Sequence, residues 1–368
     1  MKNLLPILAA TALLASCKSE PADNPAESNA YPDTTLNQVT ATAQTESVSA
    51  NPNADAAADP AIWFNESDPA NSLILGSDKT LGFDVFNLDG TRITTDSVGR
   101  INNVDVRNNY SFNGVDIALA GGSNRDNVGM DFWRIHPDSL SLEYLTPGSI
   151  ASDLPDVYRF CLYKSPADNS VYAFVNSKTG KVEQWLLGSE GDSLTATKVR
   201  ALQLPGQVEG MVTDDHPGNL FVGVENEGIY HFGAEPNDPI QGSYPELSGE
   251  DNSAIQYDVE GLTIYYLNDS KGYLIASSQG NNTYAVFERS GNFNYLGSFE
   301  VVDGAIDGTQ ETDGIDVSSQ ALGDLYPKGV FVVQDGENRE NGSVQAQNFK
   351  MIRWDHIAQS FEPALKVK

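Results

Sequence analysis

The sequence predicts an all-β fold, a six-bladed β-propeller whose blades are four-stranded antiparallel sheets. The first observation is a short phrase, an acidic residue followed by glycine and an apolar run, which begins at Glu209, Glu260 and Asp313. The second is that looser copies begin upstream at Asn102 and Asp156. A repeat of about 50 residues in which each copy opens a cluster of strands is typical of propeller blades. The third observation is that the sequence shows no long amphipathic helical pattern.

The length of 368 residues suits one large β-domain or two small ones. The chain carries 51 acidic and 22 basic residues, a net charge of −29, so nucleic acids and anionic membranes are poor partners for its surface. Two compatible explanations of the excess acid stay open: acidic side chains keep an extracellular protein soluble, or many of them bind metal ions. The sequence shows no sign of a dimer interface, and we expect a monomer.

The first residues are typical of a targeting segment. A short basic start precedes an apolar run over 4–14, which is too short to span a bilayer. Small residues then precede Cys17, as in bacterial lipoprotein signals, where the cysteine is lipidated and becomes the new N-terminus. An ordinary cleaved secretory signal is the alternative. We therefore expect a signal peptide over 1–16 and membrane attachment only through a lipid on Cys17.

The segment over 17–45 is rich in Ser, Thr, Ala, Asn and Pro and is expected to be a flexible tether. Lys18, and not an aspartate, follows the cysteine. This favours an outer-membrane lipoprotein that faces the periplasm or the cell surface, with secretion as the alternative. The propeller domain is expected over 46–368.

Each blade is predicted from an inner strand followed by β-branched and aromatic runs between turn residues. The inner strands are expected to begin near 59, 103, 158, 209, 260 and 313. The following strands are expected at 73–77 and 82–86 in blade one, 115–120 and 130–135 in blade two, 171–175 and 182–187 in blade three, 220–225 and 228–232 in blade four, 272–277 and 283–288 in blade five, and 329–334 and 349–354 in blade six. A short helical turn is expected over 355–359. The sequence also permits the N-terminal part of the domain to add a strand to the last blade and close the ring.

Several familiar catalytic patterns are absent from the sequence. The four histidines lie in different contexts, and no nucleophile elbow, phosphate-cradling glycine loop or zinc-ligand spacing occurs. Cys161 lies in an apolar, strand-like run, so we interpret it as a buried core residue without a disulfide partner. These observations disfavour covalent catalysis by histidine or cysteine.

Acidic and amide side chains supply the candidate ligands. Because the first strand of each propeller blade lines the central channel, the repeated phrase should direct one carboxylate or amide per blade to one place. Several oxygen ligands that converge in this way suit hard cations, above all calcium. The candidates are Asp59, Glu209, Glu225, Asp258, Glu260, Gln279, Asp307, Asp313, Asp335 and Asn338.

Three basic residues form a matched set. Lys79, Arg125 and Lys178 each follow the second strand of a predicted blade, on equivalent loops. Any one of them alone is more simply read as a solvated turn residue. As a set beside an acidic axis, they favour a site for an anion that metal ions bridge to the carboxylates.

Longer phrases carry a family resemblance. They begin at Asp59 (DPAIW), Ile101 (INNVD), Ser123 (SNR), Glu209 (EGM), Asp258 (DVEGLTIYY), Ser278 (SQGN), Thr312 (TDGID) and Gln334 (QDGEN). With these phrases, in this order and over 59–354, the sequence resembles the β-propeller phytases.

The resemblance implies a six-bladed propeller that hydrolyses phytate, myo-inositol hexakisphosphate, to lower inositol phosphates and phosphate with several calcium ions. It implies that the residues in contact with substrate are Lys79, Arg125, Tyr158, Lys178 and Asp313. It implies that the catalytic calcium ions are held by Glu209, Glu225, Asp258, Glu260 and Gln279, with the four acids, Lys79 and Arg125 forming the catalytic set. The calcium sites that stabilise the fold would be made mainly by Asp59, Asp307, Asp335 and Asn338.

Two positions depart from the pattern of that family. Ala58 stands where an aspartate usually precedes the Asp59 position, and Thr179 stands where an acid commonly follows the Lys178 position. Asp55 is the nearest residue that could replace the missing carboxylate through a local shift. We expect weaker binding of one calcium ion and no loss of function.

The expected mechanism follows from charge. Phytate and an acid-lined channel are both strongly negative, and two unit charges about 4 Å apart repel by about 4 kcal/mol at an effective dielectric of about 20. Calcium ions between them would reverse this field, polarise the phosphoryl group and activate a water molecule without a covalent enzyme intermediate. We expect activity at neutral to mildly alkaline pH that a chelator abolishes. The alternatives are another calcium-dependent propeller hydrolase, of the lactonase or phosphotriesterase type, and a non-enzymatic calcium-binding propeller.

Overall fold

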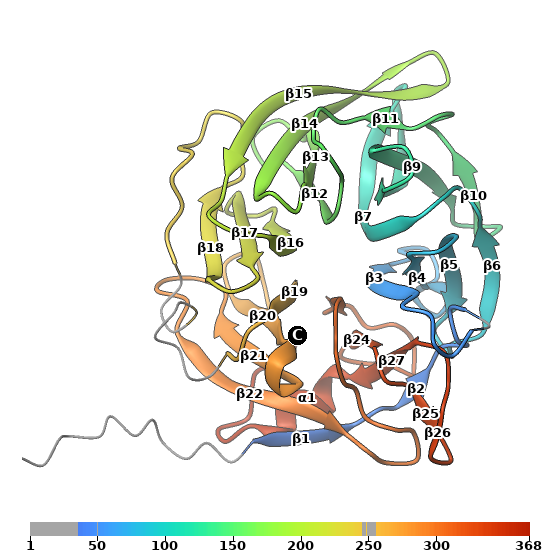
Figure 1. Cartoon of the computed structure of the whole chain (residues 1–368), viewed down its shortest axis with the longest axis vertical. Coiled ribbons are helices and arrows are strands. Elements are labelled where there is room, and N and C mark those ends of the chain that lie inside the picture. The colour runs from blue at the N-terminus through green and yellow to red at the C-terminus, as the bar shows by residue number, and fades with distance from the viewer. Residues whose placement is uncertain (1–35, 50, 245–247, 249–254) are drawn as a thin grey trace, which may run out of the picture. The chain divides into compact units, whose positions relative to one another are not determined.

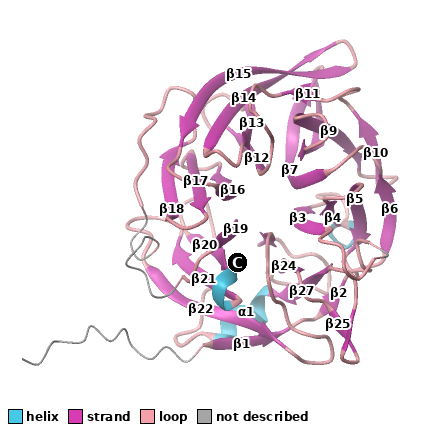
Figure 2. Cartoon of the chain, in the orientation of Figure 1, coloured by secondary structure: helices cyan, strands magenta, loops and turns pink. Residues whose placement is uncertain are grey.

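The computed structural model describes residues 36–49, 51–244, 248 and 255–368. In the compact unit that begins at Thr35, six β-sheets are arranged in a ring (Figure 1). Strands dominate this unit, and α1 (Trp354–Ser360) is the one α-helix in its described part (Figure 2). The predicted six-bladed, all-β propeller and the short helix after the last strand are therefore confirmed. The expected signal peptide and Cys17 lie outside the described residues.

Each sheet is built mainly from consecutive strands. Blade one contains β3 (Ala57–Trp63), β4 (Leu73–Asp78), β5 (Gly82–Asn87) and β6 (Arg92–Asp96). Blade two contains β7 (Ile101–Phe112), β8 (Val115–Asn124), β9 (Gly129–His136), β10 (Ser141–Tyr144) and the short β11 (Ile150–Ala151). Blade three contains β12 (Phe160–Lys164), β13 (Val171–Asn176), β14 (Lys181–Glu190) and β15 (Ser193–Gln203).

Blade four contains β16 (Val208–Asp214), β17 (Asn219–Val224) and β18 (Gly228–Gly233), which are its strands among the described residues. Blade five contains β19 (Val259–Tyr266), β20 (Gly272–Ser278), β21 (Thr283–Glu288) and β22 (Tyr295–Val302). Blade six contains β23 (Ile315–Ser318), β24 (Val330–Asp335) and β27 (Asn348–Arg353), with a small hairpin of β25 (Arg339–Glu340) and β26 (Ser343–Val344) beside it. Among the described residues, two single 3-10 turns occur, at Pro69–Asn71 and Gln279–Asn281.

The N-terminal residues of the domain complete blade six and add a fifth strand to blade five. β2 (Ala43–Gln44) pairs antiparallel with β27 as the outer strand of blade six, and β1 (Asn37–Thr40) pairs parallel with β22 of blade five. The strand added to the last blade is thus confirmed, but both strands lie inside the range predicted as a tether, so the folded domain begins before residue 46. A polar segment can form an edge strand because it needs few buried side chains; in β1 only Val39 is buried.

Hydrophobic clusters fill the interface between each pair of neighbouring blades, and six such clusters together join the blades around the ring. Between blades one and two, the rings of Phe83 and Trp133 meet edge-to-face with centroids 4.7 Å apart. At the C-terminal end, Trp354 of α1 stacks on Tyr265 of blade five with centroids 4.0 Å apart. Such close packing holds the inner strands in fixed positions around the axis. None of the helices in the described part of the chain is long and apolar enough to cross a membrane.

Candidate active site

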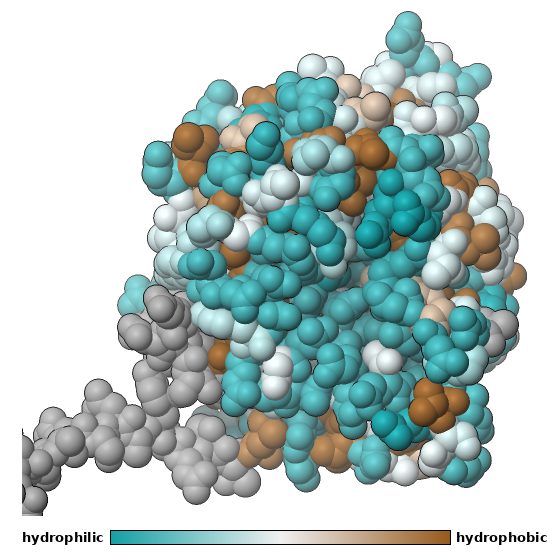
Figure 3. All heavy atoms as spheres, in the orientation of Figure 1, coloured by the Kyte–Doolittle hydropathy of each residue, from teal (hydrophilic) through white to brown (hydrophobic). Residues whose placement is uncertain are grey.

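The predicted phrase and the predicted basic loops meet at one end of the channel because of strand register. The inner strand of each blade is antiparallel to the second strand, so the start of one lies beside the end of the other. In blade one, Ala57 is opposite Asp78, the residue before Lys79. In blade four, Val208 is opposite Val224, which places Glu209 and Glu225 at the same edge. Figure 3 shows hydrophilic side chains across the centre of the face that is viewed in Figure 1.

β-bulges direct the channel-lining side chains. In β3, β7, β16 and β19 the register shifts within the first few residues of the strand. The residues left outside regular pairing at these shifts include Asp59, Asn103, Glu209 and Glu260. A bulge bends the strand and re-aims a side chain, which is a common device near active sites.

The glycine that follows each acid is required by the close approach of neighbouring inner strands. A Cβ atom on Gly210 would lie 2.1 Å from the carbonyl oxygen of Glu260, and one on Gly314 would lie 2.4 Å from the carbonyl oxygen of Ala58. Any larger residue would push the blades apart. The acid–glycine phrase therefore encodes both a channel ligand and the contact between blades.

Lys79 joins blade one to blade six. Its Nζ donates to Asp313 at 2.8 Å and to Asp55 at 2.5 Å, and its side chain is 9% exposed. Gln279 of blade five donates to the other carboxylate oxygen of Asp313 at 3.2 Å. The structure thus brings together three predicted site residues, Lys79, Asp313 and Gln279. Asp55 pairs with Lys79, and none of the hydrogen bonds of Asp55 reaches Asp59.

The other two predicted bases, Lys178 and Arg125, both lie against the ring of Tyr158. The Nζ of Lys178 lies 4.1 Å from the centroid of its ring, and the guanidinium carbon of Arg125 lies 5.8 Å from it. Arg125 also approaches the side-chain oxygen of Asn102 at 3.5 Å. Burial raises the pKa of Tyr158, so the phenol stays protonated at neutral pH and can donate a hydrogen bond.

A further cation, Arg159, lies among the acids and was not singled out from the sequence. Its Nη2 donates to Glu209 Oε2 and to Glu260 Oε2, each at 2.5 Å, and its Nε donates to the same Glu209 oxygen at 3.0 Å. Gln207, also not predicted, donates to Glu225 at 3.2 Å and to the second oxygen of Glu209.

The acids in this region repel one another. Burial raises the pKa of Glu260 well above its usual value, Arg159 opposes the shift, and Glu209 and Asp258 add to it. Burial also raises the pKa of Glu225 and Asp258, and both feel the charge of Glu209. The site therefore carries negative charge that its own bases do not fully compensate.

The donor set suits a hard cation in its chemistry, because carboxylate and amide oxygens are the ligands that calcium prefers. Over the described part of the chain, however, no three acidic, histidine or cysteine side chains are close enough to enclose a metal ion as they stand. Binding of calcium would require small movements of these side chains.

A second predicted ligand group surrounds a lysine. Nζ of Lys350, a fully buried residue of β27, lies 2.5 Å from Asp307, 2.8 Å from Asn338 and 3.3 Å from Asp335. The same ammonium donates to Gln44 of β2 at 2.7 Å. The ammonium already compensates these acids, so a metal ion at their centre would have to displace it.

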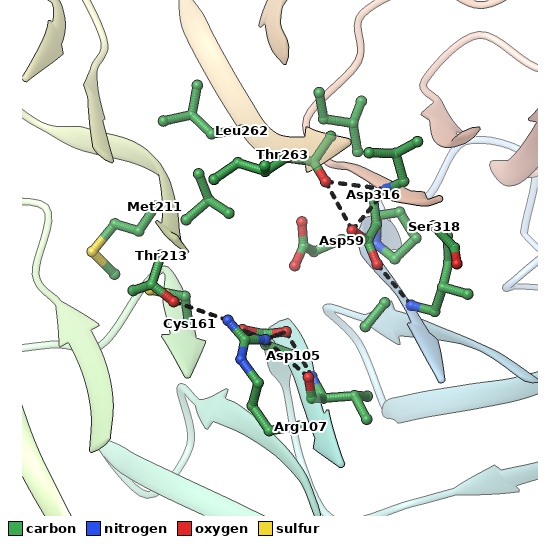
Figure 4. A pocket seen from close by; sticks show the side chains of 18 of the residues that line it. Asp59, Asp105, Arg107, Cys161, Met211, Thr213, Leu262, Thr263, Asp316 and Ser318 are labelled. Atoms are coloured by element: carbon green, nitrogen blue, oxygen red, sulfur yellow. Dashed lines mark hydrogen bonds and ion pairs between the residues drawn. The ribbon is translucent and has the colours of Figure 1, made fainter. Parts of the chain in front are cut away.

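Asp59 points into a deeper part of the channel. There it lines a cavity of about 460 Å³, and none of the other predicted site residues lines this cavity (Figure 4). Asp105 and Asp316 lie in the same cavity, where Arg107 pairs with Asp105 at 2.8 Å and Thr263 donates to Asp316 at 2.9 Å. Burial raises the pKa of all three acids, to about 6 for Asp316.

Three smaller expectations can also be compared with the structure. Ala58 is fully buried, and the hydroxyl of Thr179 is 3.0 Å from that of Ser177 in its own turn. Cys161 is buried and free, as predicted for a core residue, and burial raises the pKa of its thiol.

Comparisons with known proteins agree with this architecture. A family model described as phytase matches residues 2–368. The chain is also 42% identical over 328 residues to a 3-phytase of Bacillus subtilis (strain 168), an alignment that covers 88% of this chain and 85% of the relative. The chain belongs to the phytase family.

Proposed function

We propose that this chain is a calcium-dependent phytase, which hydrolyses phytate to lower inositol phosphates and phosphate. The observation that carries the proposal is that three predicted bases lie at one end of the channel among acids: Arg125 and Lys178 meet at the ring of Tyr158, Lys178 lies in the field of Glu225, and Lys79 pairs with Asp313. The family membership and the 3-phytase relative support the same substrate.

The bases would bind phosphate groups. Lys178 is exposed and Arg125 is partly exposed, so both are accessible to a substrate at the channel entrance. The ring of Tyr158 lies against both side chains and restricts their positions. Lys79 is held by two carboxylates and would supply a fixed charge at the far side of the same opening.

The acids would hold the cations. Glu225 lies in the field of Asp258, and both acids lie in the field of Glu209. A phosphate ester cannot approach this negative charge without compensation. Calcium bound there would neutralise this repulsion and activate a water molecule toward the phosphoryl group. Lys79, Arg125 and Lys178 would then stabilise charge on the phosphoryl oxygens.

The test is phosphate release from phytate by the purified chain, with calcium and with a chelator. We expect release with calcium, none with chelator, and recovery when calcium is returned. Asp258→Asn should lower turnover at least 100-fold with an unchanged melting temperature, because Asp258 forms no ion pair with any described residue. Asp116→Asn, a change of an exposed acid on β8, is the matched control.

Hydrolysis that persists in the chelator would contradict the proposal. So would calcium binding with no phosphate release, which would favour a non-enzymatic calcium-binding module. A lactone and a phosphotriester in the same assay address the other alternative, since such an enzyme would have no use for three phosphate-binding bases. The Glu209→Gln variant should also be inactive, but its pairing with Arg159 makes it less suited as the primary test.

A further inference from the structure

Arg159 is a buried cation at the centre of the acidic group. Its side chain is 1% exposed, and those of its partners Glu209 and Glu260 are 2% and 7% exposed. It bridges two blades, because Glu209 begins the phrase of blade four and Glu260 that of blade five. No such cation was expected between two acids that resemble calcium ligands.

The position of Arg159 is fixed from several sides. The backbone amide donates to Asn176 Oδ1 at 2.6 Å, and its carbonyl accepts from the amide of Asn176 at 3.2 Å. The guanidinium lies 4.7 Å from the ring centroid of Tyr158. Burial opposes its ionisation, yet Glu209 and Glu260 keep the pKa of Arg159 above its ordinary value, so it is charged at any working pH.

The guanidinium stands where a shared metal ion would have to stand. Calcium binds carboxylate oxygens at about 2.3–2.6 Å, and Nη2 of Arg159 lies 2.5 Å from one oxygen of each acid. An ion between the same two oxygens would overlap Nη2. A buried guanidinium that leaves this place would also leave its own charge unpaired, which is strongly unfavourable.

We propose that Arg159 replaces one calcium ion, as a permanent cation that joins Glu209 to Glu260. This inference rests on the proposed function and specifies which of the predicted acids bind calcium. Calcium is then left to the outer acids, Glu225 and Asp258, and to the second oxygen of Glu209. Arg159 is a positioning residue, because it holds two acids at the inner end of the site without contacting the reacting phosphate.

The experiment counts calcium ions on the full chain after removal of metal with a chelator, by isothermal titration calorimetry and equilibrium dialysis. Arg159→Gln should bind one more calcium ion per chain than the unaltered protein. Its melting temperature should fall in chelator and recover in calcium, because an added ion can restore the link between Glu209 and Glu260.

Two further variants keep the test decisive. Arg159→Lys retains the charge and should bind no additional calcium, and it serves if Arg159→Gln does not fold. Arg289→Gln removes another buried arginine, which pairs with Asp214 at 2.6 Å away from this site. It should lower the melting temperature without changing calcium stoichiometry and without recovery in calcium.

The inference is overturned if Arg159→Gln binds no additional calcium and calcium does not recover its stability, or if Arg159→Lys gains an ion. An unaltered protein that binds no calcium at all would overturn the proposed calcium dependence itself. The two failures are thus distinguishable in one set of titrations.

Discussion

Replacing Lys350 by methionine should strongly destabilise the chain in the absence of calcium. The ammonium is fully buried and faces both Asp307 and Asp335, whose side chains are 16% and 1% exposed. Removing one partner of a buried ion pair typically costs about 3–5 kcal/mol, since the remaining charge is left uncompensated. Asp335 is the main source of this loss, because Asp307 keeps some contact with solvent.

The loss follows from the way the ring closes. Lys350 also donates to Gln44 of β2, so its removal weakens the attachment of the strand that completes blade six. We expect the free energy of unfolding to fall by about 3–5 kcal/mol and the melting temperature by about 4–7 °C. Urea and thermal unfolding, followed by circular dichroism at neutral pH in chelator, measure both quantities.

Lys181→Met is the matched control for this prediction. Lys181 is an exposed residue of β14 that forms no ion pair with any residue in the described ranges, so its loss should change stability by less than about 0.5 kcal/mol. A loss below about 1 kcal/mol for Lys350→Met would refute the reasoning. Calcium should return part of the lost stability, because the freed oxygens of Asp307, Asp335 and Asn338 can then bind a metal ion.

Three further predictions concern the channel, the entrance and the N-terminus. Burial raises the pKa of Asp316 from 3.8 to about 6. Between these two pH values, Asp316 keeps its proton in the folded protein and releases it in the unfolded protein. The stability that this group contributes is therefore lost as pH rises from about 4 to 6. Over that range the free energy of unfolding of the unaltered protein should fall by up to about 3 kcal/mol relative to that of Asp316→Asn. Urea unfolding in chelator measures this difference. A difference that is constant with pH would contradict this. Lys178→Gln should lower kcat/KM for phytate about 10–100-fold without changing the melting temperature, because one charged phosphate contact is lost; steady-state kinetics measure it, and unchanged kinetics would remove Lys178 from the site. Cys17→Ser should abolish labelling by a fatty acid and release the protein from the membrane fraction, whereas unchanged fractionation would argue against a lipid anchor.

The architecture could be predicted because one local pattern has two structural consequences. The acid at Glu209 or Glu260 sits in a β-bulge, and the following glycine allows the next blade to approach within contact distance. The need for a channel-facing acid and the need for a glycine at the contact between blades fall on adjacent residues. The acid–glycine phrase therefore recurs once per blade and can be recognised in the sequence. The loop positions of Lys79, Arg125 and Lys178 followed from the antiparallel register of the first two strands of each blade.

The internal cations could not be predicted, because their partners are distant in the chain. Arg159 lies beside an apolar run and pairs with residues 50 and 101 positions away. Lys350 lies between Phe349 and Met351, a pattern that is typical of a solvent-facing residue in a strand. It is buried because β2, from the other end of the domain, covers it, with Gln44 306 positions away.

These cations divide the predicted acids into two classes. Glu209 and Glu260 are compensated by Arg159, and Asp313 by Lys79. Glu225 and Asp258 form no ion pair within the described part of the chain, although burial and the charge of Glu209 raise the pKa of both. The uncompensated charge thus lies beside the exposed Lys178, where a phosphate group would enter. An added cation is needed beside Glu225 and Asp258, and not between Glu209 and Glu260, which Arg159 already joins. Metal binding and substrate binding would therefore occur at the same place.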